Sequence, residues 1–196
     1  MKPAKTVTAS AVLVIFFISL LFDKEVTAFL SLQRSAVLDI FFKAITNAGL
    51  IIVLLFVILT LVLWMQKKRE WILPLWLSIL IAEAITYALK FIIQRPRPEL
   101  ITGVGALVKV SSFSFPSGHA TIAFAALPLL YGLYPRLKYL WAVLALLIAF
   151  SRLYLGVHYL SDVVFGAMIG YACGLMVVGA ANREWFKKIN IFASKG

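Results

Sequence analysis

The chain contains two histidines, and both stand next to residues that suit the chemistry of an anion. His158 precedes Asp162 by four positions, so the two side chains share one face if the segment is helical. An aspartate placed in this way can bind one imidazole nitrogen and leave the other nitrogen as a nucleophile. The pair is equally compatible with an aspartate that the helix dipole favours, next to a histidine at a membrane boundary.

His119 ends the run Phe115-Pro116-Ser117-Gly118-His119, which predicts a turn at the start of a helix. The free N–H groups of a helix start attract anions, and Gly118 lets the backbone approach a ligand closely. Because His119 lacks an orienting carboxylate like that of His158, it is the better general acid of the two histidines. Taken alone, the same run would indicate only the beginning of a helix.

Three basic side chains complete the candidate site, namely Lys90, Arg97 and Arg152. A lysine point charge and a planar arginine fork suit different oxygens of one phosphate group. Arg152 comes before His158 at the end of an apolar stretch, where a guanidinium needs an anion or a carboxylate. A basic flank of a membrane helix and an arginine that snorkels to the surface are the alternatives. Arg95 is predicted to be a charge at the rim, and its contact with phosphate is left open.

Membrane helices must position these residues, because 63% of the 196 residues are hydrophobic and the mean hydropathy is +0.99. Soluble domains are only about 45–50% apolar. A spanning helix needs about 20 residues, and the shorter blocks must borrow flanking residues to reach this length. The six apolar blocks are Val7–Phe22, Thr46–Met65, Trp71–Ile93, His119–Leu133, Tyr139–Val157 and Asp162–Ala180. The predicted fold is therefore a single all-α domain, residues 1–196, with six transmembrane helices.

Two further features concern how the helices lie. Val26–Ile45, between the first two blocks, mixes apolar and charged residues and is predicted to lie as an amphipathic segment in the membrane interface. A cleaved signal peptide is the alternative for the first block, with a cleavage site at Val26–Ala28, although the charges of Asp23–Glu25 fit it poorly. In the last block, glycine recurs at every fourth residue from Gly166 to Gly174, which predicts close packing within the helix bundle.

Basic clusters fall at alternate ends of the predicted helices. They are Lys2 with Lys5, Lys67–Arg69, Arg136 with Lys138, and Arg183 with Lys187 and Lys188. The positive-inside rule places these clusters, and with them both termini, in the cytoplasm. The candidate site is then expected on the extracytoplasmic side of the cell membrane.

Together, the segments have the forms K-x6-R-P from Lys90, P-S-G-H from Pro116 and S-R-x5-H-x3-D from Ser151. Since every motif position is matched, the chain resembles the type 2 phosphatidic acid phosphatase (PAP2) superfamily over about residues 90–162, and it looks like the compact bacterial or archaeal members. The resemblance implies a membrane phosphatase that forms a phosphohistidine intermediate.

The resemblance also implies roles for individual residues. The catalytic residues would be His158 as nucleophile, His119 as acid and Asp162 as the partner of the nucleophile. The phosphate ligands would be Lys90, Arg97, Ser117, the backbone of Gly118, and Arg152. Members of the family are similar in needing no metal or other cofactor for turnover.

The predicted substrate is a lipid phosphate or diphosphate in the bilayer, and undecaprenyl diphosphate and phosphatidylglycerophosphate are favoured. A transporter of lipid phosphate or anions would also use cations within the membrane, but it has no need of a His-x3-Asp pair. The superfamily also includes haloperoxidases, but these are soluble and lack such apolar spans. The net charge of +11 could suit nucleic acid, yet the basic residues are scattered and the positive-inside rule explains much of the excess. Nothing in the sequence indicates an obligatory protein partner.

Overall fold

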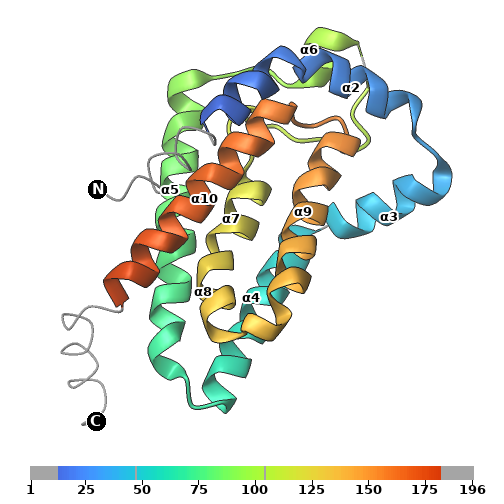
Figure 1. The fold of residues 1–196 in the computed structure, drawn as a ribbon. Coiled ribbons are helices and arrows are strands. Elements are labelled where there is room, and N and C mark those ends of the chain that lie inside the picture. Colours follow the sequence, from blue (N-terminus) through green and yellow to red (C-terminus); the bar gives the residue numbers. More distant parts are fainter. Residues whose placement is uncertain (1–12, 47, 104, 182–196) are drawn as a thin grey trace.

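Figure 1 shows the computed structural model, which describes residues 13–46, 48–103 and 105–181. Over these ranges the regular structure consists of helices and contains no strand, in agreement with the predicted all-α fold. The beginning of the first apolar block and the basic clusters near the two termini lie outside the described residues.

The helices follow one another with short connections. Residues 13–21 are helical, and they are followed by α2 (Asp23–Leu32), α3 (Ala36–Thr46), α4 (Ala48–Met65), α5 (Ile72–Ile93), α6 (Pro98–Thr102), α7 (Gly118–Ala125), α8 (Leu127–Leu133), α9 (Lys138–Tyr154) and α10 (Leu160–Ala181). Short 3-10 turns at Arg69–Trp71 and Pro135–Leu137 precede α5 and α9.

Three helical stretches of the described chain are long and apolar enough to cross a membrane: Arg69–Leu100, Pro135–Tyr154 and Leu160–Ala181. Their outward surfaces carry large apolar side chains, such as Ile92, which is 75% exposed, and Met176, which is 61% exposed. Lipid tails solvate such side chains as well as a protein core does, so the helices associate mainly through close packing and polar contacts.

The fourth apolar block differs from the single helix that the sequence predicts. It forms two short helices, α7 and α8, which join at Ala126. Pro128 lies in the first turn of α8, and it has no N–H group to continue the hydrogen-bond ladder of α7. The interruption is local, because Ala126 keeps right-handed helical backbone angles within the apolar run from Gly118 to Leu133.

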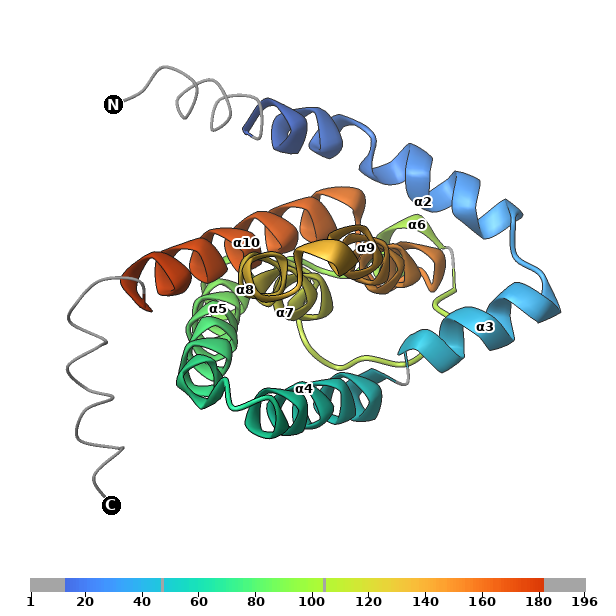
Figure 2. The same cartoon turned by 60° about the horizontal axis from the view of Figure 1, so that its bottom comes forward.

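The glycines of α10 let it pack very closely against α7. A Cβ atom added to Gly166 would lie 2.6 Å from the carbonyl oxygen of Ser117, and one added to Gly170 would collide with the carbonyl of Thr121. Thr121 also bonds the buried hydroxyl of Thr86 on α5 at 3.1 Å. Figures 1 and 2 both show α5, α7 and α10 side by side. The glycines therefore pack within the bundle, as their spacing predicts, and they fix the height of Ser117 against α10.

The segment predicted to be interfacial, Val26–Ile45, forms parts of two helices, α2 and α3, separated by a turn. The turn is fastened to the bundle by Arg34, whose Nη1 donates to the carbonyl of Gly105 at 2.7 Å. Tyr154, on the last turn of α9, donates its hydroxyl to Asp39 on α3 at 2.7 Å. Helices α2 and α3 thus lie beside the end of the bundle where α9 finishes and α10 begins (Figure 1).

Candidate active site

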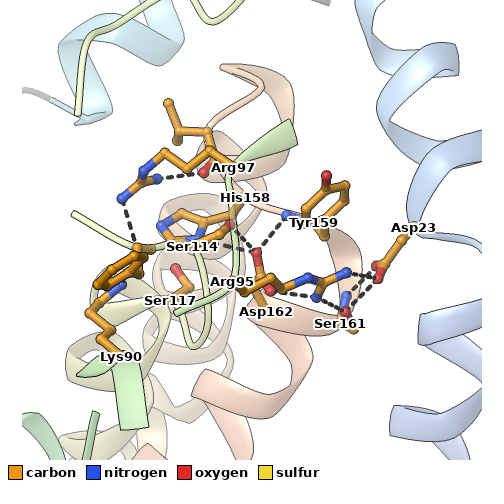
Figure 3. Close-up of polar contacts among 12 residues, drawn as sticks. Asp23, Lys90, Arg95, Arg97, Ser114, Ser117, His158, Tyr159, Ser161 and Asp162 are labelled. Carbon is orange, nitrogen blue, oxygen red and sulfur yellow. Dashed lines mark hydrogen bonds and ion pairs between the residues drawn. The ribbon is translucent and has the colours of Figure 1, made fainter. Parts of the chain in front are cut away.

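The three sequence motifs meet at one end of the bundle, at the top of Figure 1, where α5 and α9 finish and α7 and α10 begin. Gly156, in the turn between α9 and α10, has a φ of +73°, a left-handed conformation that glycine adopts without steric cost. This turn brings His158 back over the start of α10. Figure 3 shows the resulting cluster of polar side chains.

His158 does not lie on a helix, in contrast to the shared helical face that the sequence predicts. Helix α10 begins at Leu160, so His158 belongs to the preceding turn and Asp162 to the first turn of the helix. The two side chains still meet, with His158 Nδ1 3.5 Å from Asp162 Oδ2. This separation is longer than a good hydrogen bond. Both side chains are buried, and Nδ1 faces the carboxylate, so Nε2 is the ring nitrogen left for chemistry.

Asp162 ties the motifs together. Its Oδ2 accepts hydrogen bonds from the backbone N–H of Tyr159 at 2.8 Å and from the hydroxyl of Ser114. The bond to Tyr159 caps the start of α10, as an acidic residue in the first helical turn commonly does. The backbone carbonyl of Asp162 accepts the N–H of Ser117 at 3.0 Å. One residue therefore links the start of α10, the loop before α7 and the first residue of the Ser-Gly-His turn.

Ser117 has extended backbone angles just before α7, with φ −78° and ψ 109°, as expected for a residue that precedes a helix. Its hydroxyl is buried and has no hydrogen-bond partner among the described residues. A buried hydroxyl without a partner is costly, and an anion at the helix start would satisfy it. His119, in the first turn of α7, interacts electrostatically with Arg152 and His158. His119 is thus close enough to Arg152 and His158 for their charges to interact.

Arg97 is 4% exposed and anchors the loop between α6 and α7 to the site. Its Nε donates to the carbonyl of Ser112 at 2.7 Å, and one terminal nitrogen donates to the carbonyl of Val157, next to His158. Lys90 donates its Nζ to the carbonyl of Phe113 at 2.6 Å. Carbonyl oxygens are weaker acceptors than phosphate oxygens, so both cations can transfer donors to an incoming phosphate.

Arg152 is 3% exposed and lies on the last turn of α9. It interacts electrostatically with His119 and His158. All the predicted site residues thus come to the same end of the bundle, with the two histidines among the cations. Their individual roles stay predictions.

Arg95 is not the rim charge that the sequence predicts. Its side chain is 24% exposed and joins two carboxylates, Asp162 and Asp23, with both nitrogen–oxygen distances at 2.7 Å. The guanidinium also lies over the ring of Tyr159, 4.1 Å from the ring centroid. The reason is local: Gln94 ends α5 in a left-handed conformation with φ 49° and ψ 36°, and the chain then turns away from the helix axis. Arg95 and Arg97 accordingly serve different partners.

Two acidic residues outside the three motifs also lie near the site. Asp23, at the start of α2, is 5% exposed. Glu83, on α5, interacts electrostatically with Lys90, and a Cβ atom added to Gly118 would lie 3.1 Å from its Oε1. Acidic residues are rare in apolar stretches, so the sequence indicates that each of them has a function. It does not indicate which residue each of them contacts.

Burial keeps His158 neutral. Desolvation lowers the pKa of His158 from 6.5 to about 4, and the neighbouring Asp162 carboxylate opposes this shift only in part. A neutral imidazole has a free lone pair on one nitrogen, which is what a nucleophile needs at neutral pH. No group of three or more His, Cys, Asp or Glu side chains in the described part of the chain could hold a metal ion. Turnover without a metal stays a prediction.

Comparison with known proteins identifies the family of the chain. Residues 71–186 match the family model of the PAP2 superfamily. Decaprenylphosphoryl-5-phosphoribose phosphatase from Mycobacterium tuberculosis is 36% identical over 125 residues, which cover 63% of this chain and 69% of the relative. An undecaprenyl-diphosphatase from Sulfolobus acidocaldarius is 28% identical over 132 residues, which cover 66% of this chain and 64% of the relative.

A solved structure agrees as well. The crystal structure of a transmembrane PAP2-type phosphatidylglycerolphosphate phosphatase from Bacillus subtilis superimposes with a TM-score of 0.73 at 28% identity, and the match covers 87% of this chain and 94% of that one. Of the functions weighed from the sequence, hydrolysis of a lipid phosphate is therefore the one that applies. The chain belongs to the PAP2 superfamily and is a multi-pass membrane lipid phosphatase.

Proposed function

We propose that this phosphatase works through a phosphohistidine formed on His158. The observation that carries the proposal is the buried meeting of His158 and Asp162, 3.5 Å apart, within a cluster of cations. The carboxylate of Asp162 faces Nδ1, which leaves Nε2 to meet the bound phosphate. In the first step the Nε2 lone pair forms a bond to phosphorus while the bond from phosphorus to the lipid oxygen breaks.

His119 is the general acid of the first step. It gives a proton to the leaving oxygen, so that the lipid departs as an alcohol, or as a monophosphate if the substrate is a diphosphate. In the second step His119 takes a proton from a water molecule, and the water oxygen attacks phosphorus. The N–P bond then breaks and returns its electron pair to His158, which leaves inorganic phosphate.

Lys90, Arg97 and Arg152 bind the phosphate oxygens, together with the hydroxyl of Ser117 and the backbone N–H of Gly118. Charge spreads over the equatorial oxygens during phosphoryl transfer, so fixed donors aimed at these oxygens stabilise the transition state. The unpartnered hydroxyl of Ser117 and the carbonyl-bound Nζ of Lys90 support this assignment.

We propose six transmembrane spans, with residues 13–21, α4, α5, the α7–α8 pair, α9 and α10 as their described parts. The basic turns at Lys67–Arg69 and Arg136–Lys138 lie together at the end of the bundle opposite the site, where Tyr134 bonds Gln66 at 2.9 Å. The positive-inside rule makes that end cytoplasmic. The site then opens to the extracytoplasmic side of the cell membrane, and α2 and α3 lie in the interface.

The proposed substrate is a polyprenyl diphosphate or phosphatidylglycerophosphate. The relatives support this range, since they include an undecaprenyl-diphosphatase and a phosphatidylglycerolphosphate phosphatase. The test is phosphate release by purified protein in detergent from undecaprenyl diphosphate, phosphatidylglycerophosphate and phosphatidate. We expect one of the first two lipids to have the highest kcat/KM. Preference for phosphatidate would contradict the proposed substrate, and no release from any lipid would contradict the mechanism.

The phosphate-binding set has a separate test. Orthovanadate should inhibit competitively, because its trigonal-bipyramidal form resembles the transferring phosphoryl group held by Lys90, Arg97 and Arg152. EDTA should leave the rate unchanged. A rate that EDTA removes and a divalent metal restores would overturn the expectation of metal-free turnover.

A further inference from the structure

Asp23 is a buried acid far from the three motifs in sequence, and the hydrogen bonds of its side chain lead to the site. Its Oδ1 accepts the backbone N–H of Ser161 at 2.8 Å, and its Oδ2 accepts the hydroxyl of Ser161 at 2.6 Å. Oδ2 also accepts Nη2 of Arg95 at 2.7 Å. Figure 3 shows these contacts beside Asp162. A buried carboxylate is expensive unless it is fully paired, and Asp23 meets this requirement only through residues next to Asp162.

Arg95 transmits the position of Asp23 to Asp162. While Nη2 binds Asp23, Nη1 donates to Oδ1 of Asp162 and to the hydroxyl of Ser161, both at 2.7 Å. A guanidinium is planar and rigid, so fixing one terminal nitrogen also fixes the other. The ring of Tyr159 supports its face at 4.1 Å.

The two carboxylate oxygens of Asp162 consequently have different partners. Oδ1 is taken by Arg95, and Oδ2 is the oxygen that faces His158 Nδ1. If Arg95 lost its anchor on Asp23, the guanidinium could turn and form a two-pronged pair with both oxygens of Asp162. Oδ2 would then be shared between Arg95 and His158, and the imidazole would lose its orientation.

We propose that Asp23 is a positioning residue for the reaction: it anchors Arg95, which in turn keeps Oδ2 of Asp162 directed at His158. This inference rests on the proposed role of His158 as the nucleophile. It gives the segment at the start of α2, which lies outside the three motifs, a part in catalysis without any contact to substrate.

The first test compares Asp23→Asn with Glu25→Gln. Both variants remove one negative charge from α2 while keeping the side-chain shape, but Glu25 is exposed. Asp23→Asn should lower kcat by about ten- to a hundredfold, because small misplacements of a reacting group cost this much. KM and inhibition by orthovanadate should change less than about twofold, since the phosphate ligands are untouched. Glu25→Gln should match the wild type, and Asp23→Glu should recover part of the loss.

The second test asks whether Asp23 acts through Asp162. In an Asp162→Asn background, the further change Asp23→Asn should have almost no effect on the residual hydrolysis of an aryl phosphate, because residues that act as a unit are non-additive. An equal fractional loss in both backgrounds would overturn the proposal. A wild-type kcat for Asp23→Asn would overturn it too, while leaving the phosphohistidine mechanism intact. No turnover by the wild type would overturn both.

Ser161→Ala covers the case in which Asp23→Asn fails to fold. It removes only the hydroxyl that joins Arg95 and Asp23, and the backbone N–H of Ser161 still binds Asp23. We expect a smaller loss of kcat at unchanged KM, with elution as a single species in size-exclusion chromatography. A rise in KM at constant kcat would assign the network to substrate binding and so contradict the proposal.

Discussion

At His158, burial and charge act in opposite directions, and burial dominates. The ring is 3% exposed, and desolvation takes its pKa to about 4 despite the carboxylate of Asp162 beside it. The residue is therefore neutral in the folded protein at pH values where an exposed histidine begins to take up a proton. Two of the predictions below depend on this neutral ring.

Replacing His158 by alanine should remove turnover, because without the imidazole no bond to phosphorus can form, however well the substrate binds. We expect kcat to fall by more than about a hundredfold with the fold retained. Brief incubation of the wild type with labelled lipid phosphate, followed by an alkaline quench, should leave acid-labile label on histidine. A folded variant that keeps most of its activity would show that the covalent step does not take place at His158.

His119 should behave differently from His158 when the leaving group changes. An aryl phosphate has a leaving oxygen that departs without a proton, so His119→Ala should regain part of its lost rate on this substrate. His158→Ala should regain none, because the bond to phosphorus cannot form. The measurement is the ratio of aryl phosphate turnover to lipid phosphate turnover in each variant. An equal ratio in the two variants would contradict the assignment of His119 as the acid and His158 as the nucleophile.

The lowered pKa of His158 also has a consequence for stability. The unfolded chain takes up a proton on this ring as the pH falls below 6.5, whereas the folded chain does so only near pH 4. The contribution of neutral His158 to stability is thus complete above pH 6.5 and declines as the pH falls through this window. Between about pH 7.5 and about pH 4.5, the Tm of the wild type should drop more than that of His158→Gln. Parallel curves would show that the ring is not buried as described.

At the scale of elements, contact between α7 and α10 sets the height of the phosphate-binding turn. The N–H of Ser117 bonds the carbonyl of Asp162 at 3.0 Å, and this distance depends on how closely the glycines let the two helices approach. A methyl group at Gly170 would push the start of α7 away from α10. The position of Ser117 relative to His158 would change with it.

Gly170→Ala should therefore destabilise the protein by about 1–3 kcal/mol, the usual cost of overpacking against backbone. Gly179→Ala is the matched control on the same helix, because a Cβ atom there meets nothing within 4 Å. Its Tm should equal or exceed that of the wild type, since alanine favours helix more than glycine does. Tm measurements and phosphate release on both variants check this prediction. Equal behaviour of the two variants would mean that α7 and α10 are further apart than described.

At the scale of the whole molecule, the bundle has a polar end and a basic end. The motif residues gather where α5 and α9 finish, and the basic turns Lys67–Arg69 and Arg136–Lys138 lie at the other end (Figure 1). A lipid phosphatase can act only on headgroups that its polar end can reach. Orientation in the membrane therefore decides which leaflet supplies the substrate.

Cysteine labelling tests this orientation. Arg69, in the turn before α5, and Lys109, in the loop between α6 and α7 beyond the other end of α5, are both exposed. The native Cys173 is 2% exposed and should react poorly. With a membrane-impermeant maleimide on intact cells, Lys109→Cys should react and Arg69→Cys should not. Both should react after permeabilisation. The reverse pattern on intact cells would move the site to the cytoplasm and change the range of available lipids.

Sequence by itself was enough for the class of protein, and it named the candidate residues that the fold brings to one end of the bundle. Hydropathy identifies membrane helices because each helix must be apolar over the thickness of the bilayer and must pair its own backbone hydrogen-bonding groups. The positions of the motifs relative to the apolar blocks indicate that their residues lie at helix ends. These are local properties, so they survive without knowledge of the fold. The same reasoning predicts the fourth apolar block as one helix and gives no sign of the local turn at Ala126, because the apolar run continues past Pro128.

Tertiary structure alone decided which charges meet. Arg95 and Arg97 are two positions apart and chemically identical, yet one binds Asp23 and Asp162 while the other binds backbone carbonyls of the loop before α7. Arg95 lies 72 positions from Asp23 and 67 from Asp162, so these pairs depend on where packing places α2 and α10. Charge and spacing along the chain carry no information about that placement, because a buried ion pair forms only where the folded backbone brings both partners within reach.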